Sequence, residues 1–322
     1  MKIGLCYDLQ DTYDISGDSV YKDFSFLSEV EFVEKSLSKL GHKIILINGL
    51  EKFVKNIAKY KKKCDIIFNM IEGYKSRNRE GLVPALCEAF DIKYTGTDAF
   101  GLSLSLNKYH MSQVVKSFDI RTPLSYLIDY PIVDTDFSHS LEYPCVIKPN
   151  HEGSSMGVAL INSKTELIEK AHTLSELYKQ QLIVEEYIPG IELSIGILGT
   201  ASQAHVYSCL EFVNEDGSDI ELFDRECKYN TQFQAISPRL ETAVLNDICD
   251  KSLFIHKIMG FQDISRIDWR VNKNIPYFIE ATPLPAFDIN SDFDIGSRLV
   301  GENFETALNK VLISALNRKK DK

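Results

Sequence analysis

The chain has 322 residues, 44% of them hydrophobic and 25% charged, which is the composition of an ordinary globular protein. This length is too great for one small core and predicts two or three subdomains. The net charge of −10 argues against non-specific binding to nucleic acid, because such binding requires a basic face.

The first 97 residues alternate between strands and helices. Apolar runs predict the strands, and a helix with one apolar face stops at Gly41, a residue type that commonly terminates helices. The expected elements are strands at 3–7, 42–47, 65–69 and 92–96, and helices at 29–40 and about 81–90. This alternation predicts a small parallel sheet flanked by helices, in a subdomain that spans residues 1–97.

Residues 98–188 are expected to form a second, central subdomain. Asn107 and Lys108 open a helix, and a hairpin, a helix at 163–179 and a strand at 182–188 follow. Pro189 and Gly190 form a turn, which marks the boundary to a third subdomain at 189–322.

The third subdomain is expected to contain an antiparallel sheet, because its strands alternate between apolar and polar residues. The expected elements are strands at 192–198, 205–212, 264–271 and 277–280, helices at 240–259 and 304–317, and a polar loop at about 214–238.

No apolar run reaches the roughly 18 residues that a membrane-spanning helix requires. The N-terminus begins directly as a strand and lacks the pattern of a signal peptide. Seven cysteines never stand at C-x-x-C spacing, and the seven histidines lack the spacing of metal ligands. We therefore expect a cytoplasmic protein without disulfides that binds neither membranes nor nucleic acid.

The segment from Cys145 to Gly157 carries the strongest functional signal. It predicts a strand ending in Lys148, then a loop of small and hydroxyl-bearing residues that includes Ser154 and Ser155. Free backbone N–H groups, an ammonium group and a glycine that permits close approach suit a polyphosphate. The spacing differs from that of the Walker P-loop, so a P-loop fold is not indicated. Alone, this segment is equally well explained as a tight hairpin.

A second group follows at the end of the strand expected at 182–188. Glu185 can meet the edge of a base, Glu186 and Ile188 can offer backbone groups, and Glu192 can reach ribose hydroxyls. Alone, Glu185 and Glu192 would be ordinary surface acids.

Two more groups lie nearer the C-terminus. Lys228 and Tyr229 stand on the polar loop, where they can close over phosphates, although alone they would be an ordinary exposed loop. Arg266 and Asp268 precede Glu280 on the next expected strand, and Mg²⁺ takes such carboxylates together with phosphate oxygens. Asp268 and Glu280 can also be a structural pair that Arg266 bridges. The fixed order of all these groups is what favours one nucleotide site.

With these groups in this order, the chain resembles the ATP-grasp superfamily, and within it the D-alanine–D-alanine ligase branch of carboxylate–amine ligases. The matching segments are 69–73, 83–86, 94–97, 107–108, 148–157, 185–192, 228–229, 266–268 and 280–285. The resemblance implies an ATP-grasp fold of the α/β (α+β) class, with three subdomains and ATP between the second and third. It also implies that a carboxylate and ATP form an acyl-phosphate, from which an amine displaces phosphate to leave an amide.

Roles for individual residues follow from the resemblance. ATP contacts are implied for Lys108, Lys148, Ser154, Ser155, Glu185, Glu186, Ile188, Glu192 and Lys228. Magnesium ligands are implied at Asp268, Glu280 and Thr282, and substrate contacts at Glu72, Arg266 and Ser291. Catalytic roles are implied for Arg266, Lys228, Ser154 and Tyr229, and the 214–238 loop would act as a lid. Similar proteins are commonly dimers, so a homodimer is also an expectation.

Three features depart from the pattern of the branch. The expected Gly-Gly-x-Ser signature after the first strand is replaced by residues 6–10, so recognition of the substrate amine is changed or lost. Thr282 stands where an amide is usual, and a hydroxyl is a poorer Mg²⁺ ligand. Ala286 replaces a glycine. Asp288, Asp292 and Asp294 crowd the acceptor end, which favours a cationic acceptor as a hypothesis.

The main interpretation is an ATP-dependent ligase that joins a carboxylate and an amine of small amino-acid-like substrates. One alternative is D-alanine–D-alanine ligase itself, against which the missing signature argues. The other is a nucleotide-binding module that has lost catalysis, which Thr282 and Ala286 favour.

Overall fold

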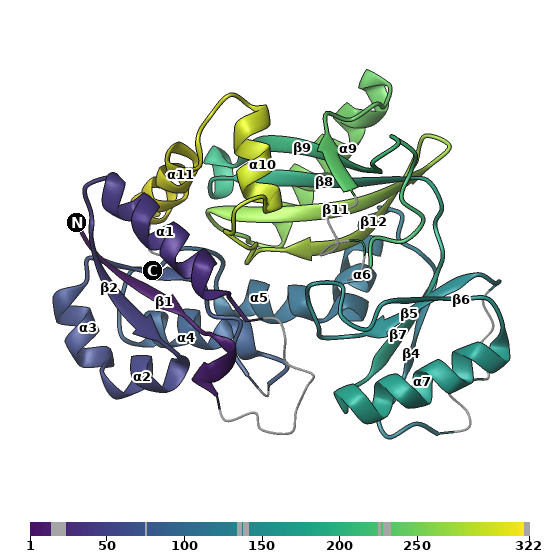
Figure 1. Cartoon of the computed structure of the whole chain (residues 1–322), viewed down its shortest axis with the longest axis horizontal. Coiled ribbons are helices and arrows are strands. Elements are labelled where there is room, and N and C mark those ends of the chain that lie inside the picture. Colours follow the sequence, from purple (N-terminus) through teal and green to yellow (C-terminus); the bar gives the residue numbers. More distant parts are fainter. Residues whose placement is uncertain are drawn as a thin grey trace.

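The structure is a computed structural model, and it describes residues 1–13, 24–74, 76–133, 137, 142–224, 227 and 233–318. Three sheets, of three, four and five strands, organise the chain. The three-stranded sheet lies at the N-terminus, and the other two face each other across the right half of the molecule in Figure 1.

The N-terminal sheet is parallel, with the strand order β2-β1-β3, which confirms the prediction from its strand–helix alternation. Its elements are β1 (Lys2–Tyr7), α1 (Leu27–Lys39), β2 (Lys43–Asn48), α2 (Leu50–Lys55), α3 (Ile57–Lys63), β3 (Ile66–Asn69) and α4 (Leu82–Ala89). The strand expected at 92–96 is only a single bridge between Tyr94 and Ile67.

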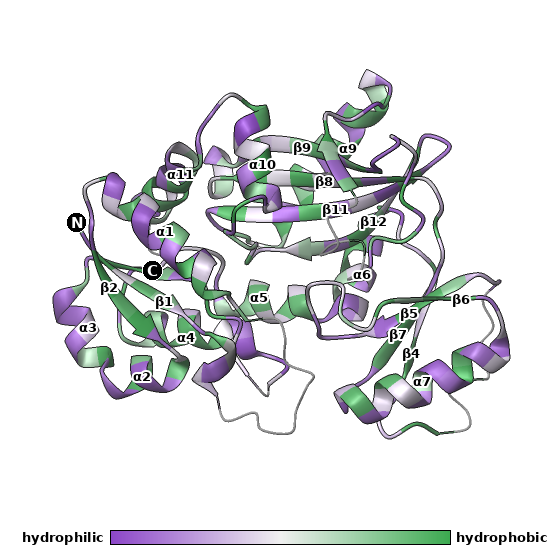
Figure 2. Cartoon of the chain, in the orientation of Figure 1, coloured by the Kyte–Doolittle hydropathy of each residue, from purple (hydrophilic) through white to green (hydrophobic). Residues whose placement is uncertain are grey.

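Helices cover both faces of this sheet. Phe53 of α2, Tyr60 of α3 and Val83 of α4 pack in the core on one face. On the other face, Val33 of α1 packs in one core with Val311 of α11 (Phe304–Asn317), the last helix of the chain. In Figure 2 these strands are mostly green, whereas α3 is largely purple. The last helix of the chain therefore covers one face of the N-terminal sheet.

The four-stranded sheet is antiparallel, with the order β4-β7-β5-β6. Its elements are β4 (Ser125–Ile128), β5 (Cys145–Pro149), β6 (Ala159–Ile161), α7 (Lys164–Tyr178) and β7 (Leu182–Glu186). Leu167, Ala171 and Leu174 of α7 pack on one face of the sheet to form a separate core. The helix begins at Ser163, whose side chain accepts a hydrogen bond from the backbone N–H of Glu166.

The five-stranded sheet is antiparallel, with the order β10-β9-β8-β11-β12. Its elements are β8 (Ile191–Leu198), β9 (His205–Asn214), β10 (Phe233–Ile236), β11 (Ile264–Asn272) and β12 (Ile275–Thr282), and α9 (Thr242–Ile258) and α10 (Asp292–Leu299) accompany it. Ile248 and Ile255 of α9 pack on one face of this sheet around Trp269.

Two helices precede the central hairpin, α5 (Ala99–Leu106) and α6 (Lys108–Lys116). Met111 and Val115 of α6 pack in the core of the five-stranded sheet. Helix α6, which precedes the four-stranded sheet in the chain, therefore packs against the five-stranded sheet. Among the described residues, no helix is long and apolar enough to cross a membrane.

Part of the segment that was expected to be a polar loop forms a strand. Phe233–Ile236 is β10, which pairs with β9. The range predicted for the loop, about 214–238, was therefore too long. The strand was missed because only four residues pair, on the edge of the sheet, and periodicity is weak in so short a run.

Candidate active site

Successive side chains of β11 point to opposite faces of the five-stranded sheet, one facing α9 and the other facing the cleft. Ile267 and Trp269 are fully buried on the side of α9, and Arg266 and Asp268 point to the opposite face. On β12, Glu280 stands directly opposite Asp268. The two carboxylates predicted to bind magnesium are therefore neighbours on one face of the sheet.

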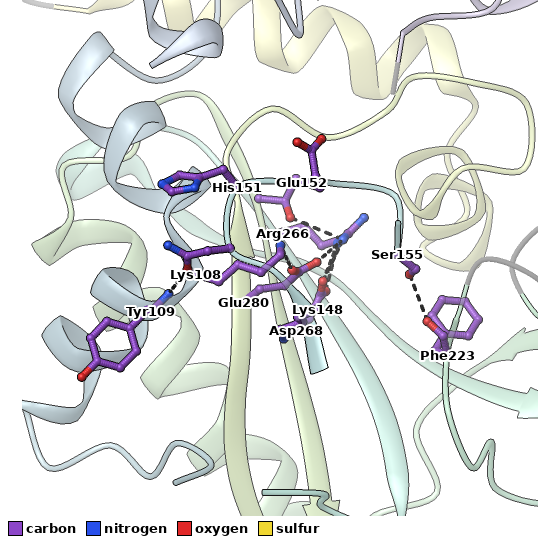
Figure 3. A network of polar contacts seen from close by, with 12 residues as sticks. Lys108, Tyr109, Lys148, His151, Glu152, Ser155, Phe223, Arg266, Asp268 and Glu280 are labelled. Atoms are coloured by element: carbon purple, nitrogen blue, oxygen red, sulfur yellow. Dashed lines mark hydrogen bonds and ion pairs between the residues drawn. The ribbon is translucent and has the colours of Figure 1, made fainter. Parts of the chain in front are cut away.

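Two lysines reach this face from other elements, as Figure 3 shows. Lys108 begins α6, where the Asn107 side chain caps the helix by accepting a hydrogen bond from His110 N–H. Its Nζ lies 2.6 Å from Oε2 of Glu280. Nζ of Lys148, on β5, lies 2.6 Å from Oε2 of Glu185, on β7. The lysines and carboxylates thus meet between the two sheets.

Arg266 connects three carboxylates. Its Nη2 lies 2.7 Å from Oδ2 of Asp268 and 3.5 Å from Oε1 of Glu280, and its Nη1 lies 2.8 Å from Oδ2 of Asp292. The Arg266 side chain is 14% exposed, so these contacts are little screened by water.

The charged neighbours of Glu280 and Lys148 shift the pKa values of these two groups. Burial would raise the pKa of Glu280, but Lys108, Arg266 and Lys148 together hold this pKa below its usual value. Burial would lower the pKa of Lys148, but the carboxylates of Glu185 and Glu280 raise it. Both groups therefore stay charged near neutral pH.

The loop between β5 and β6 has a strained backbone at its tip. Ser154 and Ser155 have φ of 47° and 55°, a left-handed conformation that side chains disfavour. The Ser155 hydroxyl donates to the Phe223 carbonyl at 3.0 Å, across the cleft. Such strain is common in loops that bind ligands.

A buried arginine of the N-terminal unit holds the base of this loop. Arg79 donates from Nη1 to the His151 carbonyl at 2.7 Å, and its Nη2 lies 3.7 Å from Glu152. Gln180 donates to Glu152 at 2.6 Å and accepts from the His151 N–H at 2.8 Å. Arg79 of the N-terminal unit and Gln180, between α7 and β7, thus fix where the loop begins.

Part of the lining of the cleft is apolar. Val146, Met156, Phe212 and Ile279 contribute to it, and apolar side chains of this kind suit a flat aromatic ring system. Glu186, Tyr187 and Ile188 also line this pocket.

Arg270 organises the segment predicted to hold a ribose. It donates from Nη1 to Glu192 at 2.9 Å, from Nε to the Ile188 carbonyl at 3.0 Å, and from Nη1 to the Ile220 carbonyl at 2.8 Å. Glu186 accepts a hydrogen bond from the Leu124 N–H at 3.2 Å.

A second cavity of about 410 Å³ adjoins the cleft. It lies between the N-terminal unit, the loop after β5 and the segment after β12. Lys108, Glu152, Arg266, Glu280 and Asp292 line both spaces, so the two meet at these charged side chains.

The structure brings the predicted site residues together in these two spaces. The cleft is lined by Lys108, Lys148, Ser155, Glu185, Glu186, Ile188, Glu192, Arg266, Asp268 and Glu280. The adjoining cavity is lined by Glu72, Ser154, Thr282 and Ser291. Lys228 and Tyr229 lie outside the described residues. The individual binding roles stay predictions.

Three residues that hold segments of the site in place were not predicted from the sequence. Arg79 and Arg270 stand in no recognised spacing, and only the packing of distant elements brings them to the site. Asp8 is a third case, because it accepts hydrogen bonds from the backbone N–H groups of Glu72 and Gly73 and from the Tyr13 hydroxyl. Burial raises the pKa of Asp8 to about 6.

Asp268 and Glu280 offer the donor set that magnesium prefers. Both are anionic oxygen ligands on adjacent strands, and Thr282 stands two residues beyond Glu280. Within the described ranges, no group of three or more His, Cys, Asp or Glu side chains could hold a metal by itself. The two carboxylates therefore fit magnesium in the type of oxygen donor that they offer.

Comparison with known structures supports the fold. A D-alanine–D-alanine ligase from Bacillus anthracis, solved with ATP, matches with a TM-score of 0.76 at 20% identity and covers 98% of this chain and 97% of that one. The VanG D-Ala:D-Ser ligase from Enterococcus faecalis matches with a TM-score of 0.74 at 19% identity, over 98% of this chain and 99% of that one.

Sequence comparison extends the likeness to curated proteins. The D-alanine–D-alanine ligase of Carboxydothermus hydrogenoformans is 27% identical over 98% of both chains. That of Thermotoga petrophila is 29% identical over 88% of this chain and 90% of its own. The family model described as the D-ala D-ala ligase C-terminus matches residues 132–313, more than half of the chain. The protein therefore belongs to the D-ala D-ala ligase C-terminus family, within the ATP-grasp superfamily.

Proposed function

We propose that the protein is an ATP-dependent carboxylate–amine ligase that acts on small amino-acid-like substrates. The observation that carries this proposal is that Lys108, Lys148 and Arg266 line one cleft together with Asp268 and Glu280, next to the point where the two cavities join. A ligase of this kind must bring two anions together, and such an arrangement offsets their repulsion.

The cleft between the two sheets is the proposed ATP site. Its apolar part would hold adenine, with Glu185, Glu186 and Ile188 at its edge, and Glu192 would bind the ribose. Lys108, Lys148, Ser154, Ser155 and Lys228 would contact the phosphates. Lys148 and Lys108 are each held by a carboxylate already, so they are oriented before the nucleotide arrives.

Asp268 and Glu280, with Thr282, would hold magnesium, which neutralises phosphate oxygens when it is bound. Thr282 is the poorest donor of the three, and it also accepts a weak contact from Arg266 at 3.4 Å. The donor set is therefore dominated by the two carboxylates.

The proposed reaction has two steps. A carboxylate oxygen of the first substrate attacks the γ-phosphorus, and the bond to ADP breaks. The amine nitrogen of the second substrate then attacks the acyl carbon, phosphate leaves and the amine loses a proton. Arg266, which lines both cavities, would stabilise the oxyanion of that second step, and Lys228, Ser154 and Tyr229 would assist it.

Water must be kept from the acyl-phosphate. The Ser155 hydroxyl already bridges the loop after β5 to Phe223, within the polar loop. A lid formed by these segments would close over the phosphates during turnover.

D-alanine–D-alanine ligase activity is the second candidate, and the relatives named above favour it. Against it stands the N-terminal unit, where Asp8 follows β1 in place of the usual signature and binds the backbone of Glu72 and Gly73. Loss of catalysis with retained nucleotide binding is the remaining alternative.

The test measures ADP release from ATP and magnesium with D-alanine and with a panel of amino acids. Ligase function predicts release that depends on an added carboxylate and amine and is lost in Lys148→Ala. Lys164→Ala, which alters an exposed lysine of α7, serves as the matched control and should retain activity. Nucleotide binding without ADP release from any pair would contradict the proposal and identify a binding module.

A further inference from the structure

The second cavity is rich in carboxylates. Glu72 and Glu80 line it from the N-terminal unit, Glu152 from the loop after β5, and Glu280, Asp288 and Asp292 from β12 and the segment beyond. The cations among its described lining residues are Lys108 and Arg266. Carboxylates therefore outnumber cations among the described lining residues, and the buried Arg79, outside this lining, lies 3.7 Å from Glu152 and 4.0 Å from Glu80.

Both cations are already engaged where the cavity joins the cleft. Lys108 contacts Glu280, and Arg266 contacts Asp268 and Asp292. In the proposed reaction these two cations serve the phosphates and the reacting carboxylate of the first substrate. No second pair of cations among the described lining residues remains for another carboxylate.

The N-terminus of α10 opens on the same cavity, and a helix N-terminus ordinarily attracts an anion. Here the chain's own side chains occupy it. The Ser291 hydroxyl accepts from the Asp294 N–H at 3.3 Å, and Asp294 accepts from the Asn290 N–H at 2.9 Å. Asp292 and Asp294 also place two negative charges in the first turn. An incoming carboxylate would have to displace these groups.

Asp292 lies where the cleft and the second cavity meet. From the first turn of α10 it reaches the guanidinium of Arg266, at the boundary between the two spaces, with its side chain 20% exposed. A carboxylate beside the attacking amine would meet the like charge of Asp292 there.

We propose that the acceptor is an amine without a neighbouring free carboxylate, preferably with a second cationic group, and that Asp292 determines this specificity. This inference rests on the proposed ligase function and names the class of its second substrate. The role of Ser291 is then to cap α10, and not to bind a substrate carboxylate.

The experiment offers D-alanine and the L-amino acids as donors with four small acceptors: glycine, D-alanine, glycinamide and 1,2-diaminoethane. ADP release is measured, and product masses show which amine was joined. We expect kcat/KM to be at least about tenfold higher for glycinamide and diaminoethane than for glycine or D-alanine, as one like-charge contact would produce. Equal or higher values for glycine or D-alanine would overturn the inference and leave ligase function intact.

Asp292→Asn tests the residue itself. Loss of the charge should narrow the difference between glycinamide and glycine to within a few-fold, mainly by improving KM for glycine. Asp250→Asn, on the exposed surface of α9, is the matched control and should keep the wild-type preference. An unchanged preference in Asp292→Asn would contradict the assignment to Asp292.

Measurements of acceptor binding test the charge selectivity independently of ligase activity. Calorimetry of the wild-type protein with magnesium and ADP should show tighter binding of 1,2-diaminoethane than of glycine. If no pair supports ADP release but this order of affinity holds, the proposed function fails and the charge selectivity stands. Equal affinities would overturn the selectivity.

Discussion

Lys148 and Glu185 form an ion pair that is almost fully removed from water, with side chains 7% and 6% exposed and 2.6 Å between Nζ and Oε2. Such a pair repays its desolvation only while both partners are present. The pair holds the lysine at the edge of the cleft, where the phosphates of a nucleotide are proposed to lie. The same contact therefore bears on stability and on binding.

Breaking this pair should be costly. We expect Lys148→Met to lower the free energy of unfolding by about 3–5 kcal/mol, because Glu185 would be left buried with its charge uncompensated. Adding Glu185→Gln should restore part of that loss, so that the double variant is more stable than Lys148→Met. Urea denaturation measures both. A double variant that loses the sum of the single effects would show that the pair is not coupled.

At the scale of elements, the loop between β5 and β6 is built around Gly157. Its φ is 69°, and a Cβ atom there would lie 2.8 Å from Cδ of Pro149 and 3.0 Å from the ring of Tyr178. Pro149 belongs to β5 and Tyr178 to α7, so the loop packs closely against both. A side chain at this position must move the loop or its neighbours.

Gly157→Ala should therefore shift the loop away from the cleft. We expect KM for ATP to rise about tenfold, the equivalent of roughly 1.4 kcal/mol of lost binding. Gly41→Ala is the matched control, because Gly41 also has a positive φ of 82° but nothing lies within 4 Å of its added Cβ. Steady-state kinetics with varied ATP measures the effect. An equal rise in both variants would show that backbone strain, and not the contact with Pro149, is responsible.

Across the whole molecule, one hydrophobic core combines both ends of the chain, whereas another belongs to the four-stranded unit alone. Val33 of the N-terminal unit shares one core with Phe287 and Val311 near the C-terminus. The four-stranded sheet and α7 have a core of their own, made of residues such as Ile147 and Leu174. The ends of the chain are therefore expected to unfold together, and the four-stranded unit to open separately.

Hydrogen exchange tests this division. Without nucleotide, amides of β5 and β7 should exchange faster than those of β8 and β11, because the smaller unit can open without disturbing the larger core. Addition of magnesium and ATP should slow exchange in β5 and β7, since binding would join the two units. Equally slow exchange in all four strands before nucleotide is added would contradict the separate opening.

Much of the architecture was determined by the sequence itself. Local hydrophobic periodicity, together with turns such as Pro189–Gly190, predicted most helices and strands, because these signals depend on neighbours in the chain. The terminal helix begins and ends where its pattern predicts. The family resemblance, which rests on Lys148, Glu185, Asp268 and the other motif residues, also predicted the ATP-grasp fold, whereas their roles in nucleotide binding stay predictions.

Only the tertiary structure decided how the charges are paired. It joins Arg79 to the loop after β5 and places Asp292 on Arg266, contacts between residues 72 and 26 positions apart. It also directs α6 onto the five-stranded sheet and reduces the strand expected at 92–96 to a single bridge. Such contacts arise when distant elements bury a common surface, and no short-range pattern in the chain records which surfaces will meet.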